Sequence, residues 1–303
     1  MTCTLVTPLL GLGLFLAVAF VSGNDLSACV GTAIGGRVIN PRTGMALGAA
    51  GLVVGVISQG SAMTHTLNAI LPISDTLTIS EMLFVIVFIF LLAHIVRIPL
   101  SLSMSVVGLL VGVATAHHLS VKAGLVGTII VVWLVAPVLA SVLALYSLRL
   151  LDRISPIDLW RRIAVYKILI VVFAFLNSYV LGTNTIGLLV AMSGFNYWNI
   201  AIGILGILIG SFFLSAGPIR RVGQDLFSLT YSNALVALIV STILVEFATF
   251  FSIPLSNTQT LSASLLGQGL SYRYKFISVR PYTVIIVGWI VAPVLSFLFG
   301  LLL

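Results

Sequence analysis

The stretch from Val21 to Gly36 reads V-S-G-N-D-L-S-A-C-V-G-T-A-I-G-G, and it extends an apolar run that begins at Leu5. The combined segment is long enough to enter a bilayer, so its polar side chains are expected at membrane depth. An ionised carboxylate there costs about 2.5 kcal/mol or more, which makes Asp25 a candidate functional group. The glycines at 23, 31, 35 and 36 predict a loosened helix whose carbonyls can turn toward a cation. The alternative is that Asp25 lies at a helix end, faces water and caps the next helix.

The composition places the whole chain in a membrane. Of its 303 residues, 60% are hydrophobic and only 7% are charged, and the mean hydropathy is +1.25. Long apolar runs recur from end to end, which excludes a soluble globular protein. The net charge of +7 therefore does not indicate nucleic-acid binding. The two cysteines, Cys3 and Cys29, form neither a disulfide framework nor a metal-ligand spacing, and no cofactor is expected.

The apolar segments predict helices. They lie at about 4–21, 43–59, 82–97, 99–116, 122–147, 163–181, 183–194, 197–215, 233–251, 254–270 and 281–303. In lipid every backbone polar group must be bonded within the protein, and the sequence lacks the alternation of β-barrel strands. We therefore predict an all-α polytopic membrane protein of about ten transmembrane helices plus broken or re-entrant segments. Segments 99–116 and 254–270 could either span the bilayer or re-enter it.

The two halves of the chain repeat one another. The heptapeptide W-L-V-A-P-V-L at 133–139 returns as W-I-V-A-P-V-L at 289–295, an offset of 156 residues. Pro99-Leu100-Ser101 returns as Pro254-Leu255-Ser256 at an offset of 155, and Gly31 falls on Gly187 at 156. Chance similarity between apolar helices would not keep one register, so we predict an internal duplication. The predicted units are a first transmembrane repeat at 1–148, a basic linker at 149–162 and a second repeat at 163–303.

Basic residues gather in alternate loops of the predicted topology. These loops hold Arg37, Arg42, Arg97, Arg149, Arg153, Arg161, Arg162, Lys167, Arg220, Arg221, Arg273, Lys275 and Arg280, whereas the intervening loops hold only Lys122. If each half crosses the membrane five times, every basic loop falls on one face, which the positive-inside rule makes cytoplasmic. An odd number of crossings inverts the second repeat relative to the first, as in many transporters. We predict a multi-pass plasma-membrane protein with a cytoplasmic linker and both termini extracellular.

Four polar stretches interrupt the apolar segments, and they form two pairs at the repeat offset. The first pair is 22–32 with 178–187. The second pair reads P-L-S-L-S-M-S at 99–105 and P-L-S-N-T-Q-T at 254–260. Proline at a first turn predicts a helix start, where free N–H groups and the positive end of the helix dipole form an anion site. The alternative is ordinary N-capping, or Ser and Thr packing at a helix interface.

These motifs resemble the signatures of the inorganic phosphate transporter (PiT) family. Gly23-Asn24-Asp25, with the residues up to Gly31, is similar to its G-A-N-D-V-A-N-A-x-G signature, and both Pro-Leu-Ser stretches are similar to its P-V-S-T-T-H signature. The segment from Gly217 to Val222 resembles its G-x-R-V segment. The resemblance spans nearly the whole chain and fits a short prokaryotic or archaeal member without a large central loop. It implies a cation-coupled phosphate symporter of inverted repeats, with both ligands bound between the signature pairs.

The sequence departs from the family pattern at several positions. Ala28 replaces the second Asn of the first signature. In the second repeat Val180 and Leu181 replace its first Asn and its Asp, while Asn184 keeps the second Asn. Neither P-V-S-T-T-H counterpart keeps the histidine. Fewer cation ligands would fit fewer sodium ions or coupling to protons, and the changed hydroxyl set leaves sulfate open as a substrate.

We therefore predict a secondary active transporter that moves inorganic phosphate together with Na+ or H+; a sulfate or other oxyanion permease of the same fold is the alternative. The predicted cation-binding residues are Asn24, Asp25, Ser27, Thr32, Thr183 and Asn184. The predicted phosphate-binding residues are Ser101, Ser103, Ser256, Asn257, Thr258 and Gln259. No metal beyond transported Na+ is expected. A homodimer would suit such a transporter, although no residue pattern indicates one.

Glu246 lies inside an apolar segment, eight residues before Pro254. It could carry a coupling proton or bind a second cation, and it could equally face a watery vestibule near the outer surface. An intramembrane enzyme would need a nucleophile and base within reach or a set of metal ligands, and the scattered histidines and carboxylates form neither. A membrane scaffold would not need duplicated polar breaks at membrane depth. We therefore predict a transporter and not an enzyme.

Overall fold

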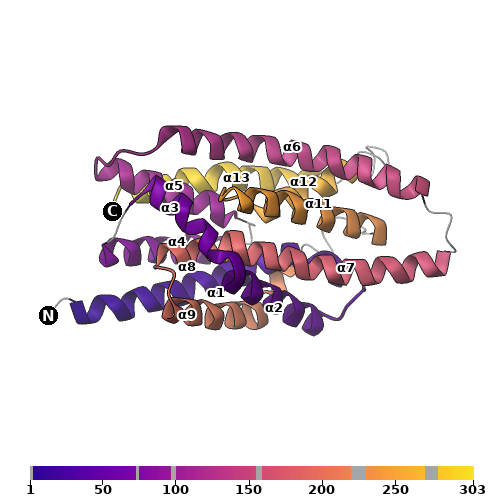
Figure 1. The fold of residues 1–303 in the computed structure, drawn as a ribbon, viewed down its shortest axis with the longest axis horizontal. Coiled ribbons are helices and arrows are strands. Elements are labelled where there is room, and N and C mark those ends of the chain that lie inside the picture. The colour runs from indigo at the N-terminus through magenta and orange to yellow at the C-terminus, as the bar shows by residue number, and fades with distance from the viewer. Residues whose placement is uncertain (1–2, 73–74, 97–99, 155–158, 220–229, 270–278) are drawn as a thin grey trace.

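The computed structural model describes residues 3–72, 75–96, 100–154, 159–219, 230–269 and 279–303 (Figure 1). The regular structure in these ranges is helical, which confirms the predicted all-α fold. The first half holds α1 (Cys3–Gly35), α2 (Pro41–Gln59), η1 (Gly60–Ala62), α3 (Met63–Ile70), α4 (Thr76–Val96), α5 (Leu102–Ala116) and α6 (Ala123–Ile154). The second half holds α7 (Leu159–Leu181), η2 (Gly182–Ile186), α8 (Gly187–Met192), α9 (Tyr197–Ile209), η3 (Gly210–Leu214), α11 (Tyr231–Phe250), α12 (Asn257–Gly269) and α13 (Val279–Gly300). Arg97, Pro99, Arg220, Arg221, Val222, Arg273 and Lys275, which carried predictions above, lie outside the described ranges.

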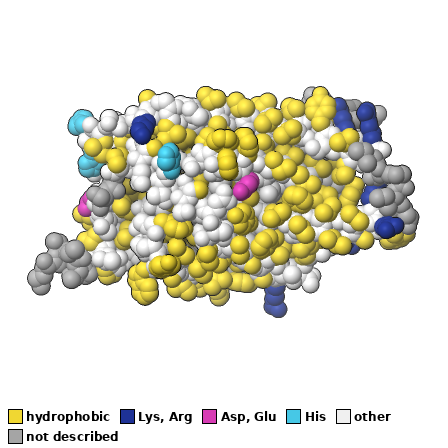
Figure 2. All heavy atoms as spheres, in the orientation of Figure 1, with side chains coloured by type: hydrophobic (Ala, Val, Ile, Leu, Met, Phe, Trp, Pro, Cys, Tyr) yellow, Lys and Arg dark blue, Asp and Glu magenta, His cyan; other side chains and the backbone are white. Residues whose placement is uncertain are grey.

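Seven helical segments of the described ranges are long and apolar enough to cross a membrane. They are Val6–Gly35, Pro41–Ile70, Thr76–Ile95, Ala123–Leu151, Trp160–Met192, Tyr197–Leu214 and Tyr231–Phe250. Two shorter apolar segments, Leu102–Ala116 and Ile286–Gly300, accompany them. Large hydrophobic side chains cover the flanks of the bundle in Figure 2, as contact with lipid requires. The chain is therefore a multi-pass membrane protein.

The helix that carries the first polar stretch is continuous. α1 runs for 33 residues, and Asp25 lies inside it with only 3% of its surface exposed, so Asp25 does not cap a helix end. The predicted loosening at the glycines is wrong for α1, because the helix is continuous through Gly23 and Gly31 to Gly35. At Gly23 the missing side chain allows close packing. A Cβ at Gly23 would come within 3.1 Å of the Gly210 carbonyl oxygen of η3. The break occurs in the second half instead, where the π-helical turn η2 lies between α7 and α8.

α11 and α12 form a hairpin that turns inside the bundle. The described part of α12 has 13 residues, a length of about 20 Å. The indole N–H of Trp133 donates to the Pro254 carbonyl at 2.8 Å, and Gln259 Nε2 donates to the Trp133 carbonyl at 2.9 Å. Trp133 lies well inside α6, so the turn of the hairpin lies at membrane depth. This position is the one expected if 254–270 is re-entrant.

The described end of α4 lies beside the middle of α1. Ring contact between Phe20 and His94, with centroids 6.5 Å apart, places the end of α4 beside the middle of α1. α5 has 15 residues and is about 22 Å long, so this second arm is too short to span the bilayer. The described part of segment 99–116 therefore has the length expected of a re-entrant arm.

Close helix contacts recur at the repeat offset. A Cβ at Gly112 of α5 would collide with the Phe297 carbonyl of α13, and a Cβ at Gly267 of α12 would collide with the Ser141 carbonyl of α6. Gly112 and Gly267 are 155 residues apart, and Ser141 and Phe297 are 156 residues apart. Both spacings equal the repeat offset, so the α5–α13 and α12–α6 contacts involve equivalent positions of the two halves. Figure 1 shows α1 and its counterpart α7 running in opposite directions. The two halves therefore contain an equivalent pair of close helix contacts.

Charge separates the two ends of the bundle. α1 begins and α13 ends at the same end in Figure 1. Figure 2 shows most of the visible Lys and Arg side chains at the opposite end, which we call the basic end. It includes Arg149 and Arg153, near the end of α6, and Arg161 and Arg162, near the start of α7.

A single methyl group at a helix crossing provides a test of this packing. A Cβ at Gly55 would collide with the Tyr179 carbonyl oxygen and lie 3.0 Å from the Thr183 nitrogen. We expect Gly55→Ala to lower the free energy of unfolding by about 1–3 kcal/mol, because overpacking a close interface costs that much. Gly127→Ala is the matched control, since a Cβ there meets no described atom within 4 Å. Equal melting temperatures for the two variants in detergent would contradict the close α2–α7 contact.

Candidate functional site

Asp25 is a buried carboxylate in the middle of the fold. The Asn24 amide donates to Asp25 Oδ1 at 2.9 Å, and the Ser27 hydroxyl donates to the Asn24 carbonyl at 2.7 Å. These three predicted cation ligands therefore lie together on one turn of α1. Among the described residues, no group of three His, Cys, Asp or Glu side chains could hold a metal ion. A cation at Asp25 would therefore be bound by one carboxylate with amide, hydroxyl and carbonyl oxygens.

One face of α1 joins this turn to α12. Asp25, Cys29 and Thr32 follow one another at spacings of four and three residues, which places them on the same helix face. Asn257 Nδ2 of α12 lies 3.4 Å from Cys29 Sγ and so packs against that face. Thr32 is fully buried, and its hydroxyl has no hydrogen-bond partner among the described residues. Because buried polar groups are normally paired, the Thr32 hydroxyl is a candidate contact for a transported ligand.

Asn184 holds the turn of the α11–α12 hairpin. Its Nδ2 donates to Thr249 Oγ1 at 2.9 Å and to the Ile253 carbonyl at 3.0 Å, and its Oδ1 accepts from the Leu255 N–H at 3.0 Å. The predicted ligand Asn184 is therefore engaged in positioning the segment that leads into α12. The Thr183 hydroxyl donates to the Val180 carbonyl of its own helix at 2.8 Å.

Asn257 is the centre of a buried polar network between three helices. Its Nδ2 donates to Asn177 Oδ1 at 2.7 Å, and its Oδ1 accepts from the Ser241 hydroxyl at 2.7 Å. Asn177 in turn donates to the Thr242 hydroxyl at 3.0 Å. The sequence reasoning missed Asn177, Ser241 and Thr242. The signal that could have found them is a polar side chain inside an apolar segment, which is costly unless paired.

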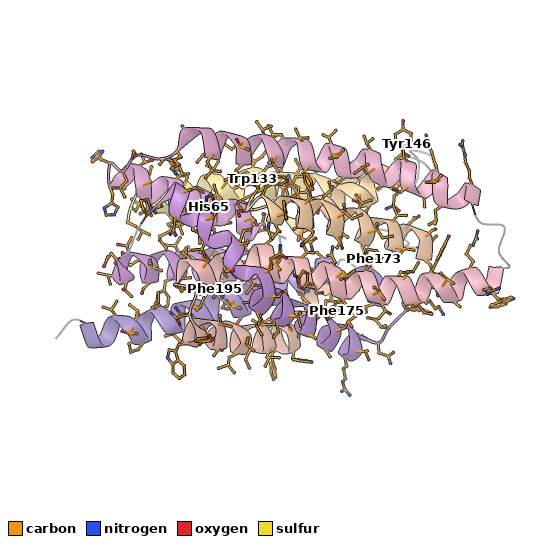
Figure 3. The ribbon with its side chains drawn as sticks, viewed as in Figure 1. His65, Trp133, Tyr146, Phe173, Phe175 and Phe195 are labelled. Atoms are coloured by element: carbon orange, nitrogen blue, oxygen red, sulfur yellow. The ribbon has the colours of Figure 1, made fainter. Side chains whose placement is uncertain are left out.

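The predicted phosphate-binding residues of α12 surround its first turn. Ser256 Oγ accepts from the Gln259 N–H at 3.3 Å and lies 2.9 Å from the Thr258 hydroxyl. Gln259 is anchored through Nε2 to the carbonyl of Trp133, which Figure 3 labels on α6, and its Oε1 is buried with no partner in the described part of the chain. The start of α12 thus offers hydroxyls, an amide and the positive end of a helix dipole in one place.

The start of α5 repeats this arrangement with fewer polar groups. Ser101 Oγ accepts from the Met104 N–H at 3.4 Å and caps the helix, so the capping interpretation is correct for Ser101. Ser103 is buried, and its hydroxyl pairs with no described residue. Within the described ranges, no hydrogen bond joins Ser101 or Ser103 to the α12 residues. The structure therefore places the two predicted halves of the phosphate site on separate hairpins.

Glu246 lies apart from the Asp25 turn, on α11. It lines a groove of about 560 Å³ on the outer side of α7 and α11, together with Thr242 and an apolar set. That set is Phe173, Leu176, Tyr179, Val180, Ile243, Phe247 and Phe250, of which Figure 3 labels Phe173 on α7. Glu246 Oε2 is buried and has no partner among the residues that the structure describes. The groove reaches the central network through Thr242, which accepts from Asn177.

Comparison with known proteins places these features in a family. A family model described as the phosphate transporter family matches residues 21–177 and 158–300. A protein of Methanocaldococcus jannaschii named "Putative phosphate permease" is 22% identical over 289 residues, covering 95% of this chain and 94% of its own. A Bacillus subtilis protein named "Probable low-affinity inorganic phosphate transporter" is 25% identical, covering 94% and 92%. A solved structure named "The sodium-dependent phosphate transporter" has the same fold, with a TM-score of 0.88 at 16% identity over 99% of this chain and 98% of that one.

Proposed function

Because the chain belongs to the phosphate transporter family, we propose that it is a secondary active transporter that carries inorganic phosphate across the membrane together with a cation. The family and the similar proteins are transporters and permeases, so the chain is not an enzyme. Phosphate transport follows from the family, and the coupling to a cation is our proposal.

One observation supports the proposal most directly. Of the buried side-chain atoms that have no partner within the described ranges, three belong to residues predicted as ligands, namely Thr32, Ser103 and Gln259. An unpaired buried polar atom costs about 1–3 kcal/mol, so such atoms are expected where a transported ion or water completes the bonding. They lie on α1, α5 and α12, which are among the helices that carry the family signatures.

The cation is bound at Asp25 in this proposal. Asn24, Asp25, Ser27 and Thr32 of α1 supply oxygen ligands in this proposal, and Thr183 and Asn184 of η2 are the ligands assigned to the second repeat. Hard monovalent and divalent cations prefer such oxygens. Sodium is the first ion to test, ahead of H+, because the structurally similar transporter is sodium-dependent by name.

Phosphate binds at the helix starts of the two hairpins. Ser101 and Ser103 contribute from α5, and Ser256, Asn257, Thr258 and Gln259 contribute from α12, together with free N–H groups. A cation beside a phosphate dianion offsets the cost of bringing either charge into low dielectric, which couples the two ligands electrostatically. This coupling needs no direct contact between them.

The two halves are inverted repeats in this proposal, 1–148 and 163–303, joined by the cytoplasmic linker 149–162. The equivalent glycine contacts, the hairpin in each half and the opposite directions of α1 and α7 support it. The basic end then faces the cytoplasm of a plasma membrane, and both termini face outward. Alternating access follows if one repeat-derived bundle rocks against the other around the hairpins.

The test is radiolabelled phosphate uptake into proteoliposomes, with Na+ and proton gradients imposed separately and unlabelled sulfate as competitor. We expect an inward Na+ gradient to drive uptake that excess sulfate does not reduce. Uptake driven only by the proton gradient, and lost in Glu246→Gln, would assign coupling to H+ and Glu246. No phosphate uptake under either gradient, with sulfate accumulating instead, would replace phosphate by sulfate as the substrate.

A further inference from the structure

A buried polar stripe runs along α12 beyond the residues of the family signature. Asn257, Thr260, Ser264 and Gln268 are spaced by three, four and four residues and therefore share one helix face. All four are buried. Gln268 is 1% exposed, and neither its amide nitrogen nor its amide oxygen has a partner among the described residues.

α11 adds a second side to this stripe. The Ser241 hydroxyl contacts both Asn257 and Thr260, the latter at 2.6 Å, while the hairpin makes α11 and α12 antiparallel. Asn233 precedes Ser241 by eight residues and Gln268 follows Thr260 by eight, so the two amides lie at the same level of the hairpin. Asn233 Oδ1 is also buried and bonded to no described group.

α1 forms the third side. Its Asp25–Cys29–Thr32 face meets Asn257 of α12 through Cys29, and the Thr32 hydroxyl is unpaired within the described part of the chain. Asp25 and Thr32 of α1, Asn233 of α11, and Ser264 and Gln268 of α12 lie on neighbouring helices that extend to the basic end, and we call these five residues the polar track.

α1 ends at Gly35, and the described part of α12 runs as far as Gly269. Both helices direct the negative ends of their dipoles toward the basic end. The exposed Arg37 follows α1 directly. The negative helix ends attract a cation along the track. The positive charge of the solvated Arg37 disfavours binding of the cation at the basic end.

The other hairpin shows that packing alone does not require these polar residues. At the repeat offset of 155, Gln268 corresponds to Val113, Ser264 to Leu109 and Ser241 to Ile86. These three apolar counterparts are all fully buried. The same hairpin architecture therefore forms with an apolar face in one half and a polar face in the other.

We propose that the polar track is a release path along which a monovalent cation leaves Asp25 toward the basic end. Its groups are a carboxylate, two hydroxyls and two amides, whose oxygens suit a cation, and all five residues are uncharged apart from Asp25. The atoms of Thr32, Asn233 and Gln268 that pair with no described group can bond to a passing cation or its water. The identification of this cation as the Na+ coupled to phosphate rests on the proposed function. The existence of the path does not depend on the proposed function.

Silver ion, a monovalent cation that reacts with thiols, tests the path in the purified full-length protein. Ser264→Cys and Gln268→Cys are compared with Leu109→Cys and Val113→Cys, their counterparts in the apolar half, with the wild type as baseline for Cys3 and Cys29. After exposure to silver the protein is denatured and labelled with maleimide, and a thiol that has bound silver is no longer labelled. We expect the cysteines at positions 264 and 268 to react with silver at least about tenfold faster than those at 109 and 113, because access controls thiol reactivity. We also expect Na+ to slow the reaction of silver with the two track cysteines. Equal rates at positions 268 and 113 would overturn the proposal.

Gln268→Leu provides a measurement that does not depend on a new cysteine. We expect equilibrium binding of radioactive Na+ to be unchanged, because Asp25 is intact, and Na+-driven uptake to slow about tenfold or more, because a polar contact to the moving charge is lost. Uptake at the wild-type rate would contradict the path. Silver access with Na+ protection but no phosphate uptake would leave the path standing and reject the proposed substrate, so the two failures are distinguishable.

Discussion

Replacing Asp25 by asparagine is expected to abolish cation-driven phosphate uptake while leaving the protein folded. The change removes the one carboxylate on the α1 turn that holds Asn24 and Ser27, and it keeps the side-chain volume. Loss of an outer-shell partner already costs about 10- to 100-fold in metal affinity, so loss of a charged ligand is expected to cost at least as much. Burying a neutral amide in place of a carboxylate also lowers the desolvation cost, so the melting temperature is not expected to fall.

The measurement is Na+ dependence of phosphate uptake in proteoliposomes, with thermal unfolding in parallel. Asp75→Asn is the matched control, since Asp75 is exposed just before α4. Hydrogen bonds from the Thr78 side chain and backbone lower the pKa of Asp75, which marks it as an ordinary solvated helix cap. We expect that variant to transport normally. Wild-type uptake in Asp25→Asn would remove Asp25 from the cation site.

Replacing Asn184 by leucine is expected to unlock the α11–α12 hairpin and weaken phosphate binding. The change leaves the Leu255 N–H, the Ile253 carbonyl and the Thr249 hydroxyl without the amide that now pairs them. Each unsatisfied buried group costs about 1–3 kcal/mol, so the free energy of unfolding is expected to fall by about 2–5 kcal/mol. The start of α12, with Ser256 and Asn257, would then lose its fixed position.

Asn199→Leu separates a local effect from general destabilisation. Asn199 is also buried and donates to two backbone carbonyls, Ser193 at 2.6 Å and Gly194 at 2.9 Å, but it lies at the start of α9. We expect both variants to melt earlier and only Asn184→Leu to raise the KM for phosphate. An unchanged KM in Asn184→Leu would show that its hydrogen bonds support the fold without positioning the site.

Much of the fold followed from local sequence patterns. Apolar segments of membrane length predicted the helices, because hydropathy along a single helix does not depend on its neighbours. The return of W-L-V-A-P-V-L as W-I-V-A-P-V-L predicted two related halves, and the contacts of Gly112 and Gly267 agree with it. Gly23-Asn24-Asp25 and the Pro-Leu-Ser stretches indicated the family that the family model then matched.

Other features depended on how the helices pack. Hydropathy cannot show which elements a polar break contacts, whereas the Trp133–Pro254 hydrogen bond joins the α11–α12 turn to the interior of α6. Asn177 and Ser241 carry no motif, yet they meet Asn257 because helices distant in sequence pack side by side.

The role of a polar side chain inside a membrane was likewise set by its neighbours. Local pattern was enough to place Asn184 and Gln268 in helical segments of a duplicated transporter. In the packed structure Asn184 is hydrogen-bonded to the hairpin turn, for example to the Leu255 N–H. Gln268 is buried, and its amide has no partner in the described ranges. The physical reason is that a helix specifies its own backbone hydrogen bonds locally, whereas side-chain pairing depends on which face of another helix lies opposite.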